Sequence, residues 1–120
     1  MSYLVQHLPR ERGGVVRPLR RGARVDERLR LNREGYFGDA YVRVFVEDTS
    51  RRARRRRIPE PRIKLRIADC SNVIALEFDV STAGFRENSL FKVDTLLGAL
   101  TRFRHALVEE AELYAARERR

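Results

Sequence analysis

Apolar and polar residues alternate through the middle of the chain, and this period of two predicts β-strands. In residues 41–47 a valine occupies every second position, and β-branched residues favour strands. Residues 62–67 alternate without interruption, so that one face carries Ile63, Leu65 and Ile67. The opposite face of this strand carries three cations. The pattern therefore predicts two neighbouring strands with one apolar and one charged face.

Two further segments extend this predicted sheet. Residues 73–80 alternate in the same way, and the polar residues 69–72 before them have the composition of a turn, which together predict a hairpin. Residues 28–31 also alternate, and the polar, glycine-containing residues 32–35 that follow favour a second hairpin turn. We therefore expect three or four antiparallel strands.

From about Asn88 to Arg117 the apolar period changes from two to 3.6, which predicts one amphipathic helix with Asn88 or Ser89 as its N-cap. Its apolar side chains fall within an arc of roughly 140°. Seven of them follow the 3,4 spacing by which a helix packs against another helix, and they form a candidate oligomer interface: Leu90, Val93, Leu97, Leu100, Leu107, Ala111 and Tyr114. A helix of about 45 Å is longer than the sheet, so we expect its last turns to protrude or to meet a partner such as a second copy.

The predicted fold class is α+β, a three- to four-stranded antiparallel β-meander followed by one long C-terminal helix that packs on one sheet face. The 120 residues fit one domain, which we place at residues 25–120. It includes an arginine-rich loop at 49–61 and the helix at about 88–117. Residues 1–24 are rich in arginine, glycine and proline, and we expect a flexible basic arm there.

The chain is strongly basic, with 26 Lys+Arg against 17 Asp+Glu and a net charge of +9. Residues 1–67 hold 19 basic and 8 acidic residues, a net charge of +11, whereas residues 68–120 hold 7 and 9, a net charge of −2. This asymmetry favours an anionic partner that approaches from one side. The longest apolar run has only four residues, 73–76, so we expect a cytoplasmic protein without a membrane segment.

The densest positive charge lies between two predicted strands, where six of seven residues are arginine: Arg51, Arg52, Arg54, Arg55, Arg56 and Arg57. Guanidinium groups bind phosphate with a planar fork of donors, so a loop of this composition suits a nucleic-acid backbone. Such loops also bind acidic proteins, and others are simply solvated surface.

The face of the sheet that the helix does not cover is predicted to carry aromatic and cationic side chains together: Tyr41, Arg43, Phe45, Arg62, Lys64 and Arg66. Aromatic rings among cations can stack unpaired bases while the cations hold phosphates. The same two rings could instead be covered by residues 1–30 or by a dimer interface.

The sequence gives little support for catalysis. His105 lies four residues before Glu109 on the polar side of the predicted helix, which indicates a solvated ion pair rather than a catalytic dyad. Cys70 lies in a predicted turn, with no base next to it in the sequence. One cysteine and two distant histidines do not have the spacing of zinc ligands. We therefore expect no catalytic residue, metal or cofactor.

These observations lead to two hypotheses about function. The first is a small, non-enzymatic nucleic-acid-binding protein that contacts mainly the phosphate backbone and has low sequence specificity, with a homodimer formed through the helix as a further expectation. The alternative is an assembly or adaptor protein whose basic half docks on an acidic protein and whose helix mediates oligomerisation. The sequence does not distinguish DNA from RNA, or single from double strands.

Overall fold

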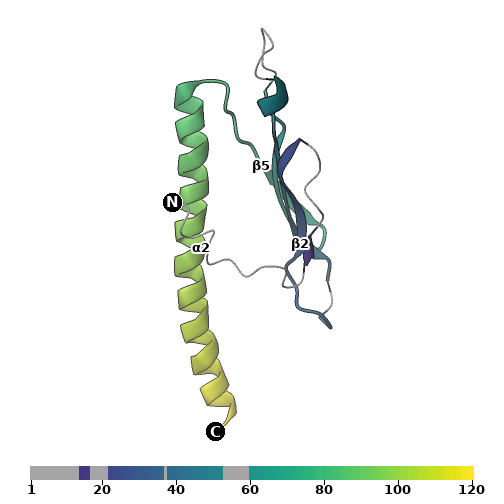
Figure 1. The fold of residues 1–120 in the computed structure, drawn as a ribbon. Coiled ribbons are helices and arrows are strands. Elements are labelled where there is room, and N and C mark those ends of the chain that lie inside the picture. Colours follow the sequence, from purple (N-terminus) through teal and green to yellow (C-terminus); the bar gives the residue numbers. More distant parts are fainter. Residues whose placement is uncertain (1–13, 17–21, 37, 53–59) are drawn as a thin grey trace.

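A computed structural model describes residues 14–16, 22–36, 38–52 and 60–120. Five strands form one antiparallel sheet in the order in which they occur in the chain, and a single long helix follows (Figure 1). The elements are β1 (Gly14–Val16), β2 (Ala23–Arg30), β3 (Ala40–Glu47), the short 3-10 helix η1 (Ser50–Arg52), β4 (Ile63–Asp69), β5 (Asn72–Leu76) and α2 (Ala83–Glu118). This arrangement confirms the predicted α+β meander with a C-terminal helix.

The sheet has one strand more than the three or four expected. The additional strand is β1, which lies within the segment predicted as a basic arm and pairs with residues 27–29 of β2. Strand β2 itself begins at Ala23, five residues before the predicted start at Arg28. The rest of the predicted arm, residues 1–13 and 17–21, lies outside the described residues.

The strand register sorts the side chains onto two faces. Val42, Val44 and Val46 of β3 lie opposite Ile67, Leu65 and Ile63 of β4, and these six residues form what we call the apolar face. On the other side, Arg43 lies opposite Arg66 and Phe45 lies opposite Lys64. We call this side the cationic face. The alternation along each strand is sufficient to produce both faces, because neighbouring side chains in a strand point in opposite directions.

The β4–β5 hairpin closes through a two-residue turn of Cys70 and Ser71, with Asp69 paired to Asn72. Cys70 has a φ of 54°, a left-handed conformation that is uncommon for a residue with a side chain. The predicted turn at 69–72 is therefore confirmed. The preceding loop, between β2 and β3, has Gly38 at φ 104°, and its carbonyl accepts a hydrogen bond of 2.9 Å from Asn32 Nδ2.

Two predicted boundaries differ from the structure. Strand β5 ends at Leu76, so that Phe78 and Val80 lie in the connection to the helix rather than in a strand. Within this connection Asp79 Oδ1 accepts a hydrogen bond of 2.8 Å from Ser81 N. The helix begins at Ala83 rather than near Asn88, and its N-cap is Thr82, whose Oγ1 accepts a hydrogen bond of 3.1 Å from Phe85 N.

Helix α2 runs beside the sheet and continues well past it (Figure 1). Its 36 residues span about 54 Å, within a molecule that measures 70 × 30 × 29 Å. Residues 92–94 and 96–98 are half-buried, whereas every residue from 99 to 114 is exposed. In the described part of the chain only two apolar residues are buried, Ala40 and Ala68. None of the helices among the described residues is long and apolar enough to cross a lipid bilayer.

Candidate nucleic-acid interface

Three arginines on three neighbouring strands form a row across the cationic face. Arg28 of β2 lies opposite Arg43 of β3, which in turn lies opposite Arg66 of β4. Like charges at directly opposed positions destabilise a sheet. The row therefore needs either neutralising partners within the protein or an anion from outside.

The central arginine is neutralised by a buried acid. Arg43 forms an ion pair with Asp26 of β2, of which only 2% is exposed. The same guanidinium nitrogen lies within hydrogen-bonding distance of two backbone oxygens, Glu27 O at 3.2 Å and Val44 O at 3.1 Å. Arg43 thus ties β3 to β2 through one of its two terminal guanidinium nitrogens.

A second acid neutralises the cation at the end of the face. Glu47 is buried, and its Oε1 accepts a hydrogen bond of 3.0 Å from Arg62 N while its Oε2 lies 3.6 Å from the Arg62 guanidinium. The next residue, Asp48, pairs with Arg24 at 3.2 Å. Hydrogen bonds from the Ser50 side chain and backbone, helped by Arg24 and Arg51, hold the pKa of Asp48 below its usual range.

Arg28 lies 3.8 Å from Asp39, so three cations of the face are left over by these pairings. Arg30, Lys64 and Arg66 are exposed, and none has an ion-pair partner among the residues that the structure describes. Arg30 and Arg66 lie on the strands that flank β3, and Lys64 lies two residues from Arg66 on the same face of β4. These side chains are the ones free to receive phosphate.

Guanidinium groups of the protein itself lie over both of the rings that were predicted to stack bases. The Arg28 guanidinium lies 3.9 Å from the ring centre of Tyr41, and those of Arg43 and Arg62 lie 5.6 and 5.5 Å from the ring centre of Phe45. Both rings are half-buried. A base would therefore meet an arginine plane above Tyr41, a surface that is itself able to stack bases.

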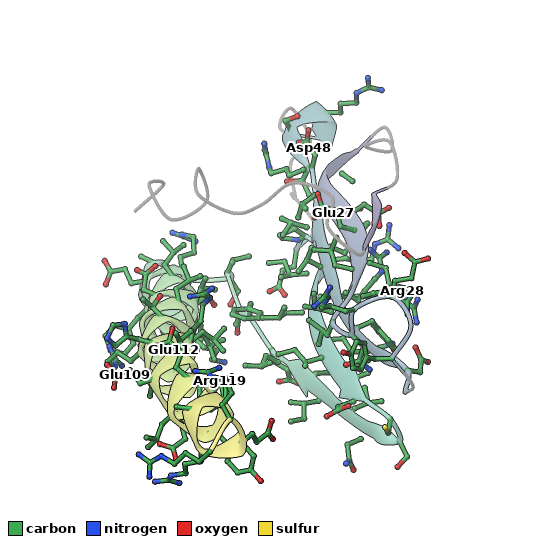
Figure 2. All side chains as sticks on the ribbon, turned by 90° about the horizontal axis from the view of Figure 1, so that it is seen from below. Glu27, Arg28, Asp48, Glu109, Glu112 and Arg119 are labelled. Atoms are coloured by element: carbon green, nitrogen blue, oxygen red, sulfur yellow. The ribbon has the colours of Figure 1, made fainter. Side chains whose placement is uncertain are left out.

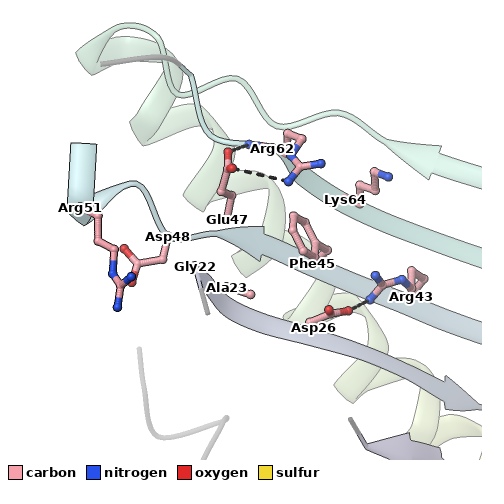
Figure 3. Close-up of a pocket in the computed structure, with 10 residues that line it drawn as sticks. All are labelled: Gly22, Ala23, Asp26, Arg43, Phe45, Glu47, Asp48, Arg51, Arg62 and Lys64. Atoms are coloured by element: carbon pink, nitrogen blue, oxygen red, sulfur yellow. Dashed lines mark hydrogen bonds and ion pairs between the residues drawn. The ribbon is translucent and has the colours of Figure 1, made fainter. Parts of the chain in front are cut away.

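A pocket of about 510 Å³ opens at the end of the cationic face where β3 leads into η1 (Figure 3). Phe45, Lys64 and Arg62 line one side, and Arg51 lies at the other (Figure 3). Helix α2 lies behind the sheet in this view, so the pocket is on the side turned away from the helix (Figure 3). Its volume lies within the range of small-ligand sites. Its lining holds both signs of charge, four cations (Arg43, Arg51, Arg62 and Lys64) and three acids (Asp26, Glu47 and Asp48).

The structure brings together six of the predicted site residues: Tyr41, Arg43, Phe45, Arg62, Lys64 and Arg66. Arg51 is exposed in η1 and lines the pocket. Arg54, Arg55, Arg56 and Arg57 lie outside the described residues, as does the side chain of Arg52.

Four residues of this surface are absent from the sequence-based prediction: Asp26, Arg28, Arg30 and Glu47. The alternating charges of residues 24–30 place Asp26, Arg28 and Arg30 on one face of a strand, and this pattern is visible in the sequence. The register between β2 and β3, which sets Asp26 beside Arg43, cannot be derived from that pattern.

The residues considered for catalysis lie outside the cationic face, His105 and Glu109 on α2 and Cys70 in the β4–β5 turn. His105 Nε2 lies 3.2 Å from Glu109 Oε1, and both side chains are more than 70% exposed, as expected of a solvated pair (Figure 2 labels Glu109). Cys70 is exposed in its turn. Within the described ranges, His, Cys, Asp and Glu do not gather into any group of three or more able to hold a metal ion.

Neither a protein-family model, nor a curated protein, nor a solved structure matches this chain. The function of the cationic face is therefore inferred from the residues and contacts described above.

Proposed function

We propose that the chain is a non-enzymatic nucleic-acid-binding protein that holds the phosphate backbone against the cationic face of its sheet. The observation that carries the proposal is the set of exposed cations without an ion-pair partner in the described structure, Arg30, Lys64 and Arg66. They lie on one face, on either side of an arginine whose own charge is already neutralised. A polyanion is the partner that such a surface attracts most strongly.

The arginine-rich segment of the sequence supplies further positive charge. It begins at Arg51, which lines the pocket at the end of the cationic face. The six arginines between positions 51 and 57 supply further phosphate contacts. Because phosphates are the same in every sequence, we expect low sequence specificity.

The test is fluorescence anisotropy of labelled single-stranded DNA, duplex DNA and RNA, titrated with the protein between about 50 and 300 mM salt. Phosphate-driven binding is expected to weaken by orders of magnitude over this range. Absence of binding at the lowest salt would contradict the proposal and direct attention to an acidic protein partner, the alternative suggested by the sequence.

Two paired variants locate the contacts. We expect Lys64→Ala with Arg66→Ala to make the slope of log K against log salt shallower by about 0.9 for each phosphate that is no longer neutralised. The matched control is Arg119→Ala with Arg120→Ala, which removes the same charge from the far end of α2. Equal effects of the two pairs would mean that only net charge matters. Replacing Arg54, Arg55, Arg56 and Arg57 with alanine tests the loop in the same assay.

A further inference from the structure

Half of helix α2 presents apolar side chains that no other described element covers. Beyond the half-buried residues 92–94 and 96–98, the helix is exposed throughout residues 99–114. Leu100 is 59% exposed, Phe103 65% and Leu107 55%, and Tyr114 is 61% exposed. Burying side chains of this size would contribute a large favourable free energy, which is absent while they remain in water.

These residues lie on one side of the helix. At about 100° per residue, Leu100, Phe103, Leu107, Val108 and Tyr114 fall within an arc of roughly 140°. We call them the distal stripe. Phe91, although it is 70% exposed, lies on the opposite side of the helix. The distal stripe therefore has the form of a helix-packing surface rather than of scattered surface residues.

We propose that a second copy of this chain covers the distal stripe, so that two α2 helices pack against each other in a homodimer. The size of the surface agrees with this. At about 200 Å² for a fully exposed large side chain, the five residues expose on the order of 1,100 Å² in the pair, close to the lower limit for a specific interface.

The charge distribution selects a second copy over an acidic or basic partner. Residues 99–120 contain five arginines and four glutamates, so this part of the chain is nearly neutral. The strong positive charge lies in residues 1–67, with a net charge of +11. Two copies that meet through the distal stripe therefore avoid the repulsion that contact between their first halves would cause.

The one charged residue within the stripe indicates the orientation. Arg104 falls in the arc of the apolar side chains and has no ion-pair partner among the described residues. Parallel helices in register would place Arg104 opposite its own copy in the middle of the interface. An antiparallel arrangement separates the two guanidinium groups and brings each toward the glutamate-rich turn of the other helix, which contains Glu110.

The experiment is the molar mass of the full chain in solution, measured by light scattering during size-exclusion chromatography over a range of concentrations. The expected value is about twice the 14.1 kDa of one chain. Leu107→Lys is expected to give the single-chain mass, because it places a cation at the centre of the stripe. The matched control is Phe91→Lys on the opposite side of the helix, which is expected to leave the mass doubled.

Three results would overturn the proposal: a single-chain mass at every concentration, a mass of three or more copies, or a doubled mass that Leu107→Lys leaves unchanged. Circular dichroism checks that each variant keeps its helix. Leu107→Ala is the milder variant if the lysine disturbs folding, and it is expected to weaken association about tenfold or more with the helix signal retained. None of these measurements involves nucleic acid, so the dimer and the proposed function can fail separately.

Discussion

At the scale of single residues, the cationic face depends on one acid, Asp26. It is almost completely buried, and its partner Arg43 also bonds two backbone carbonyls. A buried carboxylate is expensive to desolvate, so such a pair adds stability only through good geometry and additional hydrogen bonds. Removing one partner leaves the other charge buried without compensation.

We therefore expect Asp26→Asn to lower the free energy of unfolding by about 3 kcal/mol, measured by urea denaturation. Asp39→Asn is the matched control: its side chain is 78% exposed and lies 3.8 Å from Arg28, and pairs of this kind contribute at most about 1 kcal/mol. In a double-mutant cycle with Arg43→Met, the destabilisation of the double variant should be smaller than the sum of the two single effects. Additive effects would mean that the two side chains act independently.

The acids that cap turns give the protein a pH dependence. Hydrogen bonds from the Ser81 side chain and backbone hold the pKa of Asp79 below its usual range, as those from Ser50 do for Asp48. A carboxyl group whose pKa is lower in the folded chain than in the unfolded chain stabilises the fold above the unfolded pKa, about 4. That stabilisation disappears as the pH falls through the lower, folded value.

Unfolding measured between pH 7 and pH 3 should therefore show falling stability below about pH 4. Asp79→Asn should make the fall shallower, because its amide does not titrate. An identical pH profile in the variant would contradict a role for this carboxylate.

At the scale of elements, α2 contains a glycine at a position where an alanine would fit. The nearest atom to an added Cβ at Gly98 is a guanidinium nitrogen of Arg102 at 3.3 Å, the mobile end of a flexible side chain. We expect Gly98→Ala to raise stability by up to about 1 kcal/mol, seen as a higher melting temperature. Gly38→Ala is the contrasting variant and should lower the melting temperature. Gly38 has a φ of 104°, which strains a residue with a side chain, and an added Cβ would lie only 3.2 Å from Asn32 Nδ2.

Local patterns predict the central strands and most of the helix, because each of these segments repeats its period several times. Strand β1 has only the three residues Gly14–Val16, too few to display a period, and it forms through pairing with β2. The predicted helix start is too late because Asn88 and Ser89 offer N-cap side chains in the sequence, whereas Thr82 is the N-cap in the structure. The ion pair of Asp26 and Arg43 depends on the register between β2 and β3, and this register cannot be derived from a single sequence.

At the scale of the whole molecule, the described residues enclose little apolar volume. Ala40 and Ala68 are the only apolar side chains buried there, while the apolar face and residues 92–94 and 96–98 of α2 are half-buried. Stability of such a fold should be linked to association, because a partner that binds only the folded chain shifts the equilibrium toward it.

The melting temperature of the wild type should accordingly rise with protein concentration, measured by calorimetry over about a hundredfold range. Leu107→Lys should melt at a lower temperature that does not depend on concentration. A concentration-independent wild-type transition would show that each chain folds without a second copy.

The tight turn between β4 and β5 has a practical consequence. Cys70 is the one cysteine in the sequence, and it is exposed at the tip of that turn. A thiol-reactive dye will therefore label every molecule at a single defined position, on a different element from the distal stripe of α2. Mixing donor-labelled with acceptor-labelled chains then turns subunit exchange into a resonance-energy-transfer signal, with no residue of the native sequence replaced.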